Sequence, residues 1–147
     1  MVNRWMAHVK EVSAGNKGKS LKEIFKNVGI AFTRFPGGTI GNYYNWQSGN
    51  FSCHQAPDER AVKRIERMNL TLKKTATSYT VNDFFNFVKS TDTGFIYMLN
   101  IMCDSINNNS ELMKFMKQSN IDLKFIELGN ELYSGGYSFA YKNAESY

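Results

Sequence analysis

The chain has 147 residues, within the range of about 100–200 residues that is usual for one domain. Hydrophobic residues make up 42% and charged residues 21%, which excludes wholesale disorder, and 2 Pro with 11 Gly exclude collagen-like repeats and proline-rich linkers. The net charge of +5 comes from basic residues scattered over amphipathic helical patterns. Since zinc-finger, P-loop and RNA-binding aromatic signatures are also missing from the sequence, we expect no nucleic-acid partner.

The sequence also predicts no membrane span and no cleavable secretion signal. The longest apolar stretch, Phe95 to Met102, is far shorter than the roughly 18 residues that a transmembrane helix needs. Residues 1–15 contain no continuous apolar region. The compartment of the protein therefore stays open at this stage.

Cysteine and histidine positions give no sign of a metal site. Cys53 and Cys103 fit neither a metal-ligand spacing nor a disulfide framework, so the sequence predicts two free thiols. His8 and His54 have no partner at metal-ligand spacing. We expect no metal and no cofactor.

The first predicted elements are a short helix and a short strand. Ser20 and Glu23 form a capping-box pattern that begins a helix running to about Asn27, and Gly29 ends it. Residues 30–34 are short and mostly apolar, which is typical of a buried strand.

A long loop and two further helices follow. Residues 35–57 are rich in Gly, Asn and aromatic residues without a clear period, and a loop of this length is often functional. Pro57 and Asp58 begin a predicted helix with Ala61, Ile65 and Met68 on one face, and Thr80 begins the next.

The last predicted elements are a strand at 95–100, a helix capped by Asn109 or Ser110, and a strand at 122–128. This alternation of strands and helices indicates right-handed βαβ units and a parallel sheet. Functional residues of such sheets gather where the strands end. Arg34, Asn100 and the Asn130-Glu131 pair are therefore expected on one rim, suited to a hydroxyl-rich ligand.

The residues at these strand ends resemble a known family. The segment FIELGNELY (125–133) looks like the end of the fourth barrel strand in clan A retaining glycoside hydrolases, and TRFPGGTIGNYYNW (33–46) resembles the second-strand loop of their α-L-arabinofuranosidase and heparanase/β-glucuronidase-like branches. The MLN segment (98–100) matches the end of the third strand. The resemblance covers roughly residues 20–141, with one helix expected between each pair of strands.

The resemblance implies a partial (β/α)8 barrel with about three βα units, corresponding to strands 2 to 4. Residues 1–147 would form a single incomplete barrel domain, in which 1–19 are poorly defined and 20–141 carry the βα units. A whole barrel takes about 250 residues. The nucleophilic Glu of these families lies on the seventh strand, so we expect the chain to lack it and to be inactive alone.

The resemblance also implies roles for individual residues. Retaining hydrolysis needs two carboxyl groups about 5–5.5 Å apart, of which one protonates the leaving oxygen and later activates water. Glu131 would be this acid/base, and Asn130 would hydrogen-bond the sugar 2-hydroxyl. Arg34 would orient a carboxylate or brace the loop, and Asn100 would complete the rim.

Glycines and aromatic residues of the second-strand loop complete the predicted substrate site. Gly37 and Gly38 would let the backbone turn tightly. Tyr43, Tyr44 and Trp46 would stack on sugar faces, with packing in the core as the alternative. Glu127, on the same side of its strand as Glu131 by alternation, is predicted to be a structural carboxylate that lines the barrel.

Three interpretations remain open from the sequence. The first is a fragment of a retaining glycosidase whose partners are a carbohydrate substrate and the missing barrel half or a second copy. The second is a noncatalytic carbohydrate-binding or vestigial barrel piece. The third is a small parallel α/β domain with unrelated ligand binding. Relatives in the resembled families are often secreted, which keeps an extracellular location open.

Overall fold

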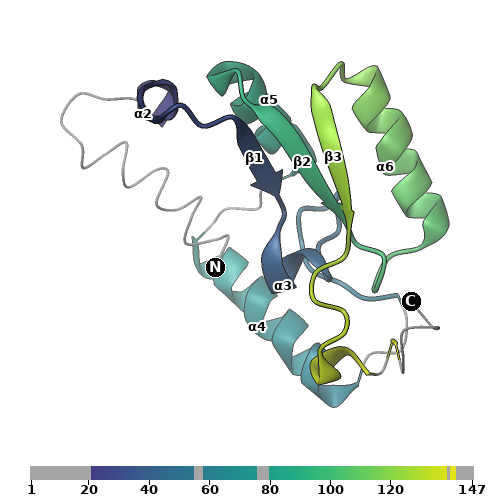
Figure 1. Cartoon of the computed structure of the whole chain (residues 1–147). Helices are drawn as coiled ribbons and strands as arrows, with labels where there is room; N and C mark the ends of the chain where they lie inside the picture. Colours follow the sequence, from purple (N-terminus) through teal and green to yellow (C-terminus); the bar gives the residue numbers. More distant parts are fainter. Residues whose placement is uncertain (1–20, 55–57, 76–79, 139, 142–147) are drawn as a thin grey trace.

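The computed structural model describes residues 21–54, 58–75, 80–138 and 140–141, and these form an α/β fold (Figure 1). Within them, no helix is long and apolar enough to cross a membrane. In chain order, the elements are α2 (Leu21–Val28), β1 (Phe32–Phe35), α3 (Gly38–Gly41), α4 (Glu59–Thr75), α5 (Val81–Thr91), β2 (Gly94–Leu99), α6 (Ile106–Gln118), β3 (Leu123–Leu128) and the 3-10 turn η1 (Gly135–Tyr137).

The three strands form one parallel sheet in the order β1-β2-β3. Arg34 is paired with Ile96, and Met98 with Glu127, so the strand ends lie in register at one edge. Figure 1 shows all three strands pointing toward the side where α3 and α4 lie. The parallel α/β fold predicted from the sequence is therefore confirmed at this level.

One face of the sheet packs against helix α5. Phe35, Phe95 and Tyr97 alternate along β1 and β2 onto this face and are almost fully buried. The ring of Phe35 stacks on Phe84 of α5 with centroids 4.3 Å apart, and Phe85 meets Phe95 edge to face at 5.8 Å. Burial of each such ring stabilises the fold by roughly 1.5–3 kcal/mol, so this aromatic layer is the main core.

The opposite face of the sheet is partly exposed in the described part of the chain, although Met98 of β2 is fully buried near the strand ends. Phe32 and Phe125 are 47% and 59% exposed, and their rings meet at 5.9 Å across Gly94. Arg34 and Glu127 lie on the same face, nearer the strand ends. All-parallel sheets usually have both faces covered, whereas this face carries exposed aromatic side chains.

Helix starts follow the predicted chemistry in two of three cases. The Asp58 side chain accepts a hydrogen bond from the backbone N–H of Ala61 at 2.8 Å and caps α4, and Thr80 forms a capping box with Asp83 at the start of α5. The predicted cap of the next helix at Asn109 or Ser110 is wrong, because Ser105 caps α6 one turn earlier. Ser20 and Pro57 lie outside the described residues.

We expected one helix between each pair of strands. This prediction is confirmed for β2 and β3, which α6 alone separates, and is wrong for β1 and β2. Three helices, α3, α4 and α5, separate β1 from β2. The extra helices lengthen the connection after β1 and bring α4 to the side where the strands end (Figure 1).

The prediction of two free thiols is wrong. Cys53 and Cys103 form a disulfide, with their Cα atoms 4.3 Å apart. The loop that follows α3 folds back over the end of β2. The separation of 50 residues between the two cysteines does not predict this contact. The disulfide therefore joins the loop to the segment that leads into α6.

Candidate functional site

Residues 129–134 form a tight turn directly after β3, which we call the Asn130 turn. Gly129 and Glu131 both have positive φ, at 70° and 51°. The Leu132 side chain is buried, and a Cβ atom on Gly129 would lie 2.5 Å from Leu132 Cδ1. The Glu131 carbonyl accepts a hydrogen bond from Ser134 N–H at 2.9 Å, and the Glu131 side chain is exposed.

The backbone around Asn130 is held by the side chain of Asn42. The Asn42 Nδ2 donates to the Asn130 carbonyl at 2.7 Å, and the Asn130 N–H donates to Asn42 Oδ1 at 2.8 Å. Asn42 is 0% exposed, so water does not compete for these contacts. Asn42 is not among the site residues predicted from the sequence, because an isolated Asn in an Asn-rich loop carries no signal of its own.

The side chain of Asn130 is oriented by Arg34. The Arg34 Nη2 donates to Asn130 Oδ1 at 3.3 Å, and Arg34 Nε donates to Glu127 Oε2 at 2.6 Å. Since guanidinium groups only donate, Asn130 must turn its oxygen toward Arg34, which leaves its NH₂ group as the donor for a ligand. The predicted site residues Arg34 and Asn130 therefore meet at the strand ends.

Arg34 and Glu127 form an ion pair across the partly exposed face of the sheet. Their side chains are 39% and 38% exposed, so the pair contributes at most about 1 kcal/mol to stability. Its effect is geometric, because Glu127 fixes the guanidinium that orients Asn130. Arg34 thus contacts the Glu127 carboxylate, and its orientation of a carboxylate in a substrate site stays a prediction.

The glycine-rich segment after β1 is shaped around Arg34 and Met98. Gly37 and Gly38 have φ of 55° and 65°, as the predicted tight turn requires, and a Cβ atom on Gly37 would lie 3.3 Å from Arg34 Nη1. A Cβ atom on Gly41 would lie 1.8 Å from Met98 Cε. The absence of side chains at these positions brings Asn42 close to the Asn130 turn.

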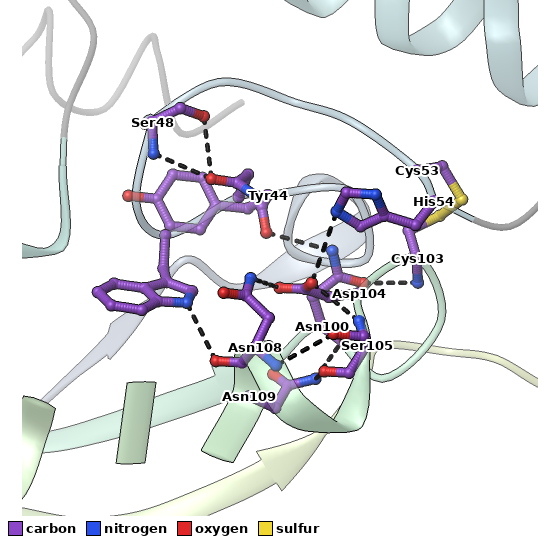
Figure 2. Close-up of polar contacts among 12 residues, drawn as sticks. Tyr44, Ser48, Cys53, His54, Asn100, Cys103, Asp104, Ser105, Asn108 and Asn109 are labelled. Carbon is purple, nitrogen blue, oxygen red and sulfur yellow. Dashed lines mark hydrogen bonds and ion pairs between the residues drawn. A yellow bond between two sulfur atoms is a disulfide. The ribbon is translucent and has the colours of Figure 1, made fainter. Parts of the chain in front are cut away.

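Asn100 connects the loop after α3 to the segment before α6 (Figure 2). Its Nδ2 donates to the Tyr44 carbonyl at 3.2 Å, and its Oδ1 accepts from Cys103 N–H at 2.9 Å. Its own carbonyl accepts from Asn109 Nδ2 at 3.1 Å. Asn100 is buried and joins two loops, so the structure does not bring its amide to the exposed rim beside Glu131.

Asp104 and His54 lie beside the disulfide (Figure 2). The side chain of Asp104 is 3% exposed and accepts hydrogen bonds from Ser105 N–H and from Asn108 Nδ2. His54 Nε2 lies 3.9 Å from Asp104 Oδ1, with the imidazole largely exposed. Asp104 therefore organises the turn that enters α6.

The aromatic residues proposed to stack on sugars are placed in packing positions. Tyr43 is 1% exposed and Tyr44 is 5% exposed. Burial raises the pKa of the phenol in both residues. Trp46 stacks on Phe115 at 5.5 Å and donates its indole N–H to the Asn108 carbonyl. Sugar stacking by Tyr43 and Trp46 stays a prediction, and the core alternative accounts for their positions.

The described residues around the Asn130 turn form no metal centre. Among the described residues, no group of three His, Cys, Asp or Glu side chains could hold a metal ion. A cavity of about 220 Å³ lies at the first turn of α6, where Leu99, Ile101 and Met113 line it. The Asn130 turn is instead an open rim, with Glu131 and the 88% exposed Tyr133 pointing to solvent.

Comparison with known protein families, with curated proteins and with solved structures found no match.

Proposed function

We propose that this chain is part of a retaining glycoside hydrolase with a (β/α)8 barrel, in which Glu131 is the acid/base. The observation that carries the proposal is the Asn130 turn: an Asn-Glu pair at the end of a parallel strand, with Glu131 exposed at φ 51°. A non-glycine residue at positive φ costs of order 1–3 kcal/mol, and such strain concentrates at functional sites.

The three strands would be strands 2 to 4 of the barrel. Two observations support this assignment: the strands are adjacent, parallel and in chain order, and one face of the sheet is partly exposed with an Arg34–Glu127 pair near the strand ends. Barrel interiors are layered by inward-pointing side chains from neighbouring strands. The remaining strands would cover this face and supply the nucleophile.

In this mechanism, Glu131 donates a proton to the departing glycosidic oxygen and then accepts one from water. Asn130 would donate its NH₂ hydrogens to the sugar 2-hydroxyl, a contact that strengthens in the transition state. Arg34 would hold the Asn130 side chain in the orientation that presents these hydrogens.

The substitution Glu131→Gln tests the role of the carboxyl group. In the protein extended to include a nucleophile, kcat/KM should fall about 10²–10⁴-fold for aryl glycosides with poor leaving groups and change little for dinitrophenyl glycosides, which need no protonation. Glu111→Gln is the matched control, because Glu111 is exposed on α6 and pairs with Lys114 of the same helix. An equal loss on both substrate kinds, or no loss, contradicts the acid/base role.

The 147-residue chain by itself should hydrolyse no aryl glycoside, because the proposed nucleophile lies on a later strand. Release of the aryl chromophore, followed by absorbance, measures this directly. Robust turnover would overturn the proposal that the chain is part of a larger site. Saccharide binding by an extended protein that shows no hydrolysis would favour the noncatalytic carbohydrate-binding alternative.

A further inference from the structure

We infer that Asn42 is a positioning residue, which fixes the backbone on both sides of Asn130 and thereby sets where Glu131 stands. The inference rests on the proposed function of Glu131 and adds a residue from a different segment of the chain to that site. Asn42 lies 88 residues before Asn130, directly after α3, and its two hydrogen bonds to the turn both go to the backbone of Asn130.

The two hydrogen bonds act on two different peptide groups. The Asn130 N–H belongs to the peptide that joins Gly129 to Asn130, and the Asn130 carbonyl belongs to the peptide that leads to Glu131. Holding both peptide planes at 2.7 and 2.8 Å leaves the intervening φ and ψ little freedom. The Cα atom of Glu131 is part of the second plane, so its position follows from the Asn42 contact.

The contact also offsets the strain in the turn. Glu131 at φ 51° is a sparsely populated conformation, which persists only when surrounding contacts over-determine it. The buried Leu132 holds the turn on one side of Glu131, and Asn42 holds it on the other. The short helix α3 and the close approach of Gly41 to Met98 bring Asn42 to this place.

Two variants separate the two contacts. Asn42→Asp keeps the oxygen that accepts from Asn130 N–H and removes the donor to the Asn130 carbonyl. Asn42→Ala removes both. Asn45→Ala is the matched control, because Asn45 lies in the same loop and its side chain accepts hydrogen bonds from Ser48, away from the Asn130 turn.

Amide hydrogen exchange and backbone ¹⁵N relaxation of the 147-residue chain test the inference. In Asn42→Ala, Asn130 N–H exchange should accelerate at least about tenfold more than exchange of the Phe95 N–H, which bonds within the sheet region. In Asn42→Asp, Asn130 exchange should change less than about threefold while the order parameter of the Glu131 amide drops below about 0.6.

Two results would contradict the positioning role of Asn42. A uniform acceleration of Asn130 and Phe95 exchange in Asn42→Ala means that Asn42 only stabilises the fold, and unchanged Asn130 exchange in a folded variant means that it does not hold the turn. If Asn42→Ala fails to fold, the Glu131 order parameter in Asn42→Asp decides, and an unchanged value overturns the inference.

A kinetic arm links the turn to catalysis in the extended protein. Asn42→Asp should lower kcat/KM about 10–100-fold, more for poor leaving groups than for dinitrophenol, since a displacement of about 1 Å can cost 10²-fold. If the proposed function is wrong, Glu131→Gln will leave kcat/KM unchanged. If only the positioning role is wrong, Glu131→Gln will lower kcat/KM and Asn42→Asp will leave it unchanged.

Discussion

At the scale of single residues, the Asn130 turn depends on Gly129, where both the backbone conformation and a steric contact disfavour any side chain. Gly129 has φ 70°, and a Cβ atom there would lie 2.5 Å from the buried Leu132. Gly38 has φ 65° with nothing within 4 Å of such an atom. An alanine would therefore have a strained backbone at both Gly129 and Gly38, but it would clash with a neighbouring side chain only at Gly129.

We expect Gly129→Ala to destabilise the protein more than Gly38→Ala. Both substitutions cost about 1–2 kcal/mol for a left-handed alanine, and Gly129→Ala adds about 1–3 kcal/mol of overpacking against Leu132. Urea unfolding measures both losses as shifts of the midpoint. Equal losses would mean that Leu132 moves aside without cost, and the turn would then be less tightly packed than its geometry indicates.

The residue scale also explains which parts of the site were predictable. Arg34 lies near the end of β1, and Asn130 and Glu131 follow β3. The rule that parallel strands end at one edge brings such residues together from sequence alone. Asn42 could not be predicted, because its role arises from a fold-back across 88 residues. Asn100 also follows a strand, yet its amide is used by Tyr44 and Cys103.

At the scale of elements, the disulfide joins the loop after α3 to the segment that enters α6. Reduction or Cys53→Ser/Cys103→Ser should lower stability by about 2–4 kcal/mol, because the unfolded chain loses the closure of a loop of 50 residues. The thermal midpoint should fall by roughly 5–15 °C. As a control, reductant should lower the midpoint of the wild type and leave that of the double variant unchanged; equal midpoints for oxidised wild type and variant would contradict the prediction.

Element boundaries were predictable wherever local chemistry decides them. The Asp58 cap and the Thr80–Asp83 capping box begin α4 and α5 as the sequence indicates. The start of α6 was misplaced because Ser105, Asn109 and Ser110 are all good capping residues. Asp104, in the segment between β2 and α6, accepts a hydrogen bond from Ser105 N–H with its side chain 3% exposed, a tertiary contact that the local sequence does not show.

At the scale of the whole molecule, the aromatic core predicts loss of stability in alkali. Burial raises the pKa of Tyr43, Tyr44 and Tyr97, the last of them well above its ordinary value. In the unfolded chain these phenols ionise near pH 10. Above that pH the unfolded state loses protons that the folded state retains, so the free energy of unfolding falls as pH rises and is unaffected by these groups at neutral pH.

We therefore expect the buried tyrosines to ionise together with unfolding, well above pH 10. Absorbance of phenolate near 295 nm should show a late phase from Tyr43, Tyr44 and Tyr97, which rises in step with loss of the circular dichroism signal. The chain in concentrated guanidinium chloride is the control and should show one phase near pH 10. One such phase in the folded protein, with its circular dichroism retained, would mean that the aromatic layer between the sheet and α5 is open to water.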